Sequence, residues 1–339
     1  MSTTTKEFNH LQTAHCENGV VTNLLRHHGL DFMTEPLVFG LGSGLLYIHI
    51  PFLKVNHAPT VSFRSLPGNI FKSVSKRLGI KVVHKKFNNK VKAQAFVDQQ
   101  LEAGNFVGCQ VGVFHLPYFP KAYRFHFNAH NLILYGQQNG QYLVSDPVME
   151  TVTELSAAEL EDVRFARGAM APKGHVYFPT TVPEITTPQI QKALKKAIKK
   201  NAYLMTRVIF PFIGSSGFKY TGKQICKWRD QYGAQTAGLY LGQFVRMQEE
   251  IGTGGGGFRF IYAAFLQEAA QYLQDDRLLE SAQLATQSGD LLRQSAVRMA
   301  AVYKGRTTTQ QDFEAVADGL EEIADLEYRL FDQLYQMKL

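Results

Sequence analysis

Hydrophobic and polar positions follow two different patterns along the chain, a mixed one in the first half and a helical one in the second. Residues 17–28 carry apolar side chains at helical spacing and are followed by Gly29, a residue type that favours a helix C-cap. Cys16 is therefore expected at the N-terminus of a helix.

Runs of β-branched and aromatic residues indicate strands in the same half of the chain. Two of these runs flank the sequence GQQNG and predict a hairpin, whose five-residue loop, 136–140, would place His130 opposite Asp146. Helical spacing at residues 69–78 and 92–103 interrupts the strands. The first half is thus expected to form an α+β domain, with strands at residues 80–84, 106–114, 130–135 and 141–145.

The pattern changes at the sequence VPEITTP, where two prolines precede a long helical stretch. From Gln189 onward all segments have helical spacing, as far as Met337. We expect two domains, an α+β domain over residues 1–182 and an all-α domain over residues 183–339.

Composition narrows the class of protein. The three cysteines, Cys16, Cys109 and Cys226, are too few and too scattered for a disulfide framework or a zinc site, which favours a reducing compartment. The N-terminus has no apolar run of signal-peptide length, and no later stretch approaches ~20 uncharged apolar residues, so a cytoplasmic protein without a membrane segment is expected. The formal charge of +7 favours acidic partners, and no sequence signature points to a nucleic acid.

A nucleophile, a base and an orienting carboxylate are the candidate chemistry. A thiol has an unperturbed pKa of roughly 8.5, so a catalytic cysteine needs a helix N-terminus or a neighbouring cation, and Cys16 is expected to have both because His15 adjoins it. His130 would accept the thiol proton, and Asp146 would fix the imidazole tautomer. Each residue also has a structural interpretation, as a buried thiol, a sheet histidine and a turn former, and only the set indicates catalysis.

Two further residues are candidates for binding roles. Gln12 could complete an oxyanion hole with the backbone N–H of Cys16, although an exposed loop glutamine explains it as well. Arg259 follows the glycine run GTGGGGF, and a helix N-terminus there could meet the phosphate of a phosphopantetheine group, although a flexible loop is the simpler interpretation. No metal site is expected.

Three segments carry a resemblance to a known family. The stretch HCENGVVTNLLRHHGLDFMTEPLVFGLGSGL (residues 15–45) closely resembles the start of the butirosin biosynthesis protein H family, an acyl-transferring branch of papain-like proteins. AHNLILYGQQNGQYLVSDP, with His130 and Asp146, and GTGGGGFRFIYAAFLQEAA extend the resemblance over nearly the whole chain. It implies a papain-like cysteine-enzyme domain followed by a mostly helical C-terminal domain.

The resemblance also implies a reaction, in which an acyl group moves from the phosphopantetheine thioester of an acyl carrier protein, through an acyl-cysteine, to a small amine acceptor. Cys16, His130 and Asp146 match the family's nucleophile, base and orienter, and no bound cofactor is implied. Two alternatives stay open: a cysteine hydrolase, either peptidase or thioesterase, with the same triad, and a non-catalytic carrier-binding protein. The acyl chain, the acceptor and the oligomeric state, including a homodimer, are also open.

Overall fold

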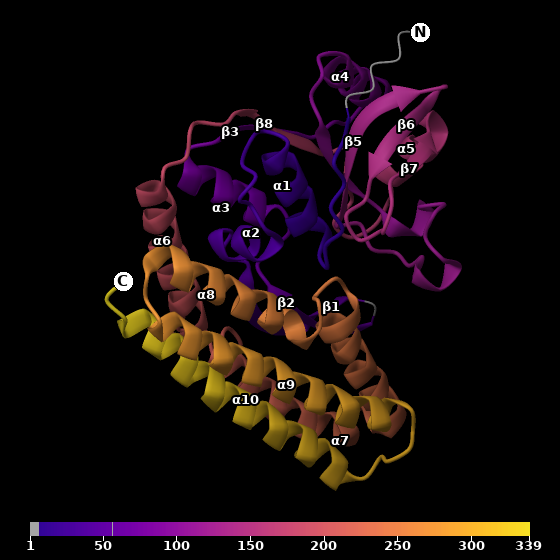
Figure 1. Ribbon diagram of the computed structural model, residues 1–339. Helices are drawn as coiled ribbons and strands as arrows, with labels where there is room; N and C mark the ends of the chain where they lie inside the picture. The colour runs from indigo at the N-terminus through magenta and orange to yellow at the C-terminus, as the bar shows by residue number, and fades with distance from the viewer. Residues whose placement is uncertain (1–6, 56) are drawn as a thin grey trace. The chain divides into compact units, whose positions relative to one another are not determined.

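The computed structural model describes residues 7–55 and 57–339 (Figure 1), so the first residues of the N-terminal segment lie outside this description. Its contacts divide the chain into two compact units. The first unit contains the residues up to Val38 together with Val74–Glu184, and the second contains Phe39–Ser73 together with Ile185–Leu339. The helices α2 (Glu35–Leu41) and α3 (Asn69–Leu78) cross from one unit to the other.

A six-stranded sheet forms the centre of the first unit. Neighbouring strands are antiparallel and lie in the order β3-β8-β4-β5-β6-β7. The strands are β3 (Lys81–Lys85), β4 (Val107–Val111), β5 (His130–Gln138), β6 (Gln141–Ser145), β7 (Thr153–Ser156) and β8 (Val176–Thr181).

Helices cover the sheet because side chains alternate between its two faces. One face buries Cys109 and Leu132 in a core with α4 (Lys90–Glu102) and α5 (Ala157–Arg164). The residues next to these in sequence, Gly108 and Asn131, face the opposite side, where α1 (Cys16–Arg26) contacts β5, β4 and β8. Cys16, the first residue of α1, therefore lies close to the central strands.

The β5–β6 hairpin has a different register from the expected one. Its turn contains two residues, Asn139 and Gly140, both at positive φ, and the strands reach Gln138 and Gln141. A register shift between Leu134 and Gly136 then pairs Ile133 with Ser145. Backbone pairing therefore does not place His130 opposite Asp146, although their side chains still meet. The predicted five-residue loop was wrong because an Asn-Gly turn with positive φ matches the twist of a tight hairpin.

The second unit is mostly helical and contains one small hairpin. The strands β1 (Leu45–Val55) and β2 (Ala58–Arg64) pair with each other, and three long helices, α7, α9 and α10, contact one another (Figure 1). The helices are α6 (Thr187–Thr206), α7 (Ser215–Val245), α8 (Arg259–Leu273), α9 (Arg277–Tyr303) and α10 (Gln310–Gln336), with short helical turns at Arg246–Glu250 and Gly256–Phe258.

The first unit ends at Glu184, near the expected end of the first domain at residue 182. The residues before Glu184 belong partly to the first unit and partly to the second, whereas one domain was expected. Phe39–Ser73, expected in the α+β domain, pack with the C-terminal helices. Aromatic packing explains this, since Tyr47 on β1 stacks on Phe218 of α7 at 3.7 Å between ring centroids. The α+β class of the first domain and the mostly helical character of the C-terminal region are confirmed.

Candidate active site

Cys16 is the first residue of α1, as the sequence predicts. His15 is the N-cap, and its Nδ1 accepts a hydrogen bond from the backbone N–H of Asn18 at 3.3 Å. A carboxylate also holds this helix start, because Glu35 accepts the backbone N–H groups of Ala14 and His15 at 2.9 and 2.8 Å. Burial raises the pKa of Glu35. These hydrogen bonds lower the pKa by a smaller amount, so it stays above its ordinary value.

The segment before Cys16 is attached to the loop after Asp146. The backbone N–H of Thr13 donates to the carbonyl of Pro147 at 2.6 Å. Gly19, one turn into α1, allows this approach, because a Cβ there would lie 2.5 Å from Cβ of Pro147. The absence of a side chain at Gly19 thus allows the helix that begins at Cys16 to lie against the residue that follows Asp146.

His130 and Asp146 form a buried pair. Nε2 of His130 lies 2.6 Å from Oδ2 of Asp146, and an ionised carboxylate can only accept, so Nε2 carries the proton. The same oxygen accepts the hydroxyl of Tyr118 at 2.8 Å, and Oδ1 accepts the backbone N–H of Val148 at 3.2 Å. Three donors therefore fix the carboxylate and, through it, the imidazole ring.

The charge state of His130 suits a thiolate partner. Burial alone would lower the pKa of His130, but the charges of Asp146 and Cys16, and hydrogen bonds to both, outweigh burial and raise the pKa to about 10. Because Asp146 occupies Nε2, Nδ1 is the nitrogen that remains for the sulfur. The arrangement favours an imidazolium beside Cys16, which is the partner that a thiolate nucleophile requires.

The surroundings of the sulfur are nearly closed. Cys16 is 7% exposed, and the ring of Phe119 meets His130 edge-on with centroids 5.3 Å apart. Nδ2 of Asn131 lies 3.7 Å from the sulfur of Cys16. Only a narrow, extended group fits the small exposed area of this thiol.

The two binding residues expected from the sequence have different outcomes. Gln12 is exposed, and its oxyanion-hole role stays a prediction. Arg259 is corrected by the structure: it is 1% exposed in the second unit, and its guanidinium forms a paired contact with Glu327 at 2.6 and 2.9 Å. A buried arginine already neutralised by a carboxylate does not meet the phosphate of a carrier protein.

The glycine run before Arg259 also binds an internal anion. Gly254 to Gly257 all have positive φ, and the backbone N–H of Gly256 lies 3.1 and 3.2 Å from the carboxylate oxygens of Glu249. Glycines are needed at these left-handed positions. The run therefore folds against a carboxylate from the preceding helical turn.

The other two cysteines lack such an environment. Burial raises the pKa of Cys109 to about 11, and burial together with Glu314 and Asp318 raises the pKa of Cys226. Among the described residues, no group of three or more histidine, cysteine or acidic side chains could hold a metal ion. Cys16 is thus the thiol with a base and a carboxylate beside it.

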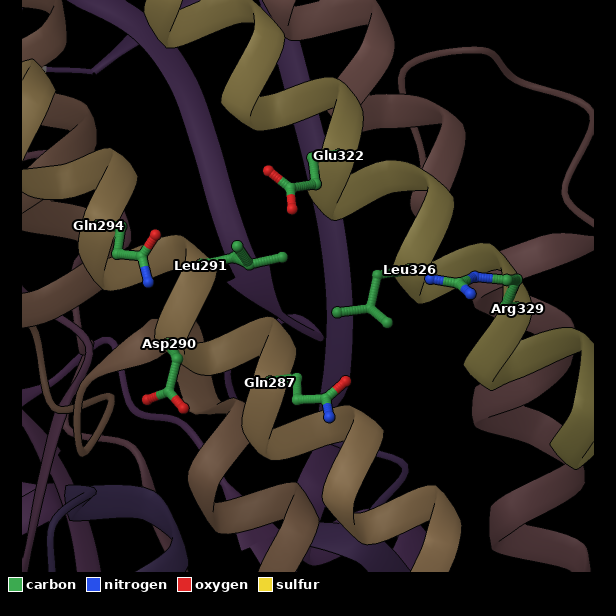
Figure 2. A pocket seen from close by; sticks show the side chains of 7 residues that line it. All are labelled: Gln287, Asp290, Leu291, Gln294, Glu322, Leu326 and Arg329. Carbon is green, nitrogen blue, oxygen red and sulfur yellow. The ribbon is translucent and has the colours of Figure 1, made fainter.

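A separate groove of about 330 Å³ lies between α9 and α10 in the second unit (Figure 2). Figure 2 shows Leu291 and Leu326 between the two helices, with polar side chains around them. Its lining residues include no thiol, imidazole or hydroxyl, so the groove lacks the groups found around Cys16. Its lining residues are Gln287, Asp290, Leu291, Gln294, Glu322, Leu326 and Arg329.

Two members of the site were missed in the sequence. Asn131 directly follows His130, and this adjacency was the only local signal for it. Tyr118 lies 28 positions from Asp146, so nothing in the local pattern connects the two.

Comparison with known families agrees with the architecture. Residues 158–334, just over half of the chain, match the family model described as a domain of unknown function, DUF4872. The chain belongs to the DUF4872 family. Residues 15–147 of this DUF4872 protein match the model described as butirosin biosynthesis protein H, N-terminal. The resemblance seen in the sequence is thus confirmed, and the matched region includes Cys16, His130 and Asp146.

A crystal structure described as a C39-like peptidase from Bacillus anthracis is also similar, with 12% sequence identity and a TM-score of 0.37. The match covers 52% of this DUF4872 chain and 96% of the other chain. Among curated proteins, none matches the sequence. Over residues 7–55 and 57–339, no helix has both the length and the apolar character needed to cross a bilayer.

Proposed function

We propose that this protein is a cysteine acyltransferase, which takes an acyl group from the phosphopantetheine thioester of an acyl carrier protein and passes it to an amine through acyl-Cys16. The observation that carries the proposal is the interaction of Cys16 with His130, by charge and by a hydrogen bond. The other ring nitrogen of His130 lies 2.6 Å from Asp146. This is the arrangement that thiol-dependent acyl transfer needs.

In the first step, the Cys16 thiolate attacks the carbonyl carbon of the donor thioester. The tetrahedral intermediate collapses with loss of the phosphopantetheine sulfur, which takes a proton from the His130 imidazolium and leaves as a thiol. The step breaks the donor's thioester bond and forms a thioester bond to Cys16, so the energies of the two bonds nearly balance. Asp146 holds the imidazole ring throughout this step.

In the second step, the amine nitrogen attacks the acyl carbon of acyl-Cys16. His130, now neutral, takes a proton from this nitrogen, and the collapse of the intermediate releases Cys16 as a thiolate. The products are an amide and the original thiolate–imidazolium pair. His130 gives up one proton in the first step and takes up one proton in the second.

Two observations favour transfer to an amine over hydrolysis. The thiol is 7% exposed and Phe119 lies against His130, so few water molecules can reach an acyl-enzyme, and its hydrolysis is slowed. The N-terminal family model is named after a protein of butirosin biosynthesis, which supports a biosynthetic role.

The proposed donor also fits the small exposed area of the Cys16 thiol and the net charge of the protein. A phosphopantetheine arm is narrow and extended, which suits a thiol with so little exposed surface. Carrier proteins are usually acidic, and the chain has a formal charge of +7. The carrier protein and the small amine are thus the proposed partners.

Intact-protein mass spectrometry tests this proposal with acyl-loaded carrier proteins and short acyl thioesters. We expect an acyl adduct on the wild type and on Cys226→Ala, which removes a more exposed thiol, and no adduct on Cys16→Ala. The adduct should clear faster with added amines than in buffer alone. Clearance at the same rate in both would instead identify a hydrolase, and a wild type without any adduct would favour a non-catalytic binding protein.

A further inference from the structure

The side chain of Asn131 contacts the sulfur of Cys16 directly. It lies on β5 beside His130, is 5% exposed, and its Nδ2 is 3.7 Å from the sulfur of Cys16 and 3.1 Å from the carbonyl oxygen of Ala129. Both N–H bonds of the amide therefore have an acceptor, and one of these acceptors is the nucleophilic atom itself.

Tyr177 fixes the orientation of this amide. Its hydroxyl donates to Oδ1 of Asn131 at 2.8 Å, and its ring is 4% exposed. A flipped amide would place its oxygen against the Ala129 carbonyl and the sulfur, and its NH₂ group would lose the acceptor at Ala129. The three contacts agree on one orientation, in which N–H points at the sulfur.

A glycine in the sheet makes this contact possible. Tyr177 on β8 pairs with Gly108 on β4, the strand that separates β8 from β5. A Cβ on Gly108 would lie 2.7 Å from the tyrosine ring. Because Gly108 has no side chain, the ring lies over β4, and its hydroxyl reaches Asn131 on β5.

We propose that Asn131 is a further catalytic residue, which stabilises the Cys16 thiolate by donating a hydrogen bond to it, and that Tyr177 is the positioning residue that aims this donor. The inference rests on the proposed role of Cys16 as the nucleophile. A hydrogen bond to a charged acceptor is about twice as strong as one between neutral groups, so the contact favours the thiolate over the thiol.

The ionisable side chains around the sulfur are few. His130 approaches from β5 with Asp146 and Tyr118 behind it, and His15, Glu17 and Glu35 lie at the start of α1. None of these is changed in the variants below. A change in the pH dependence of thiol reactivity can therefore be attributed to the Asn131–Tyr177 pair.

Alkylation of Cys16 by iodoacetamide tests the inference without any acyl donor. At pH 6, Asn131→Leu should slow alkylation by about ten- to a hundredfold and Tyr177→Phe by about three- to tenfold, the effects of losing or loosening one hydrogen bond to an anion. At pH 10, above the unperturbed thiol pKa of roughly 8.5, more of the thiol is ionised without this hydrogen bond, so the rates should move towards that of the wild type. A variant that only disturbed access to the thiol would be slow at both pH values.

Tyr142→Phe is the matched control, because Tyr142 is another buried tyrosine of the first unit, whose hydroxyl donates to Asp98 at 2.6 Å, and it does not contact Cys16. Its alkylation profile should match the wild type. Unchanged pH 6 rates in both folded test variants would overturn the inference.

Acylation rates separate this inference from the proposed function. If both test variants form the acyl-enzyme slowly but are alkylated normally, Asn131 acts on the oxyanion and not on the thiolate, which also overturns the inference. If the wild type forms no acyl-enzyme but Asn131→Leu still slows alkylation at pH 6, the thiolate contact stands and only the acyl-transfer proposal fails.

Discussion

Nε2 of His130 lies 2.6 Å from Oδ2 of Asp146, in a part of the first unit where Asp146 is completely buried. The carboxylate also accepts the Tyr118 hydroxyl, and its charge raises the pKa of that phenol further after burial has raised it. Tyr118 therefore stays a donor over the working pH range. The pair is held by contacts that do not depend on substrate.

Asp146→Asn should slow acyl-enzyme formation by about 10²- to 10⁴-fold, because an amide no longer stabilises the imidazolium or fixes its tautomer. The rate of adduct formation, followed by mass spectrometry, measures this effect. Asp98→Asn is the control, because Asp98 also binds a tyrosine hydroxyl, that of Tyr142 at 2.6 Å, away from Cys16. Equal rates for Asp146→Asn and the wild type would remove Asp146 from the mechanism.

The sequence predicted which residues meet here, but not how the backbone brings them together. Cys16 begins a helix as the apolar spacing indicated, while His130 begins β5 and Asp146 directly follows the end of β6. The register was wrong because a turn of two residues and one of five have similar composition, whereas the positive φ of Asn139 decides between them.

Local sequence patterns could not predict contacts between residues that are far apart in the sequence. Arg259 and Glu327 are 68 positions apart, so the glycine run and the arginine resembled an anion site when they were considered alone. Tyr177 and Asn131 are 46 positions apart and meet because Gly108 leaves room between their strands. Such contacts depend on the order of the strands and on which helices pack together, and the spacing of apolar residues specifies neither.

Arg259→Met should destabilise the second unit by about 3–5 kcal/mol, because it leaves the carboxylate of Glu327 buried without its cationic partner. Arg259→Met combined with Glu327→Met should recover much of this loss. Urea unfolding followed by the fluorescence of Trp228 measures the effect, since this is the chain's one tryptophan and it is buried in the second unit.

The control for this experiment is Lys219→Met, which removes an exposed cation from Asp325 at 2.7 Å and should change the unfolding midpoint little. Equal midpoints for Arg259→Met and Lys219→Met would show that the buried pair does not stabilise the unit. Acylation of Cys16 in folded Arg259→Met should match the wild type, since this arginine is not a carrier contact.

His49 should make the stability of the second unit depend on pH. Burial lowers the pKa of His49 to about 4, from about 6.5 in an unfolded chain. Between these values the unfolded chain binds the proton and the folded one does not, so the stabilisation is complete above about pH 6.5 and is lost as the pH falls towards 4. Between pH 7.5 and 5.0 the loss from this group is ~2 kcal/mol.

His49→Phe should lack this part of the pH dependence, because its ring stays among the aromatic side chains of Tyr220 and Trp228 but cannot titrate. Urea unfolding at the two pH values, again followed by Trp228 fluorescence, measures the difference between the variant and the wild type. An identical loss of stability in both proteins would mean that His49 takes up its proton in the folded state.

Gly19→Ala should lower the melting temperature and slow the alkylation of Cys16, although alanine is the better helix former. The new Cβ would lie 2.0 Å from Oγ1 of Thr13 and 2.5 Å from Cβ of Pro147. The threonine side chain can rotate away, but the proline ring cannot. The contact must therefore displace either α1 or the loop that begins at Asp146, and both positions define the geometry at the sulfur.

Gly319→Ala, in the middle of α10, is the matched control for this prediction. The nearest atom to its new Cβ would be Nη1 of Arg298 at 3.4 Å, the far end of a flexible side chain. This variant should gain about 1 kcal/mol from helix propensity and leave Cys16 alkylation unchanged. Thermal melting by circular dichroism and iodoacetamide kinetics compare the two variants. If Gly19→Ala were stabilised in the same way as Gly319→Ala, the close approach of Pro147 to α1 would not hold Cys16 in place.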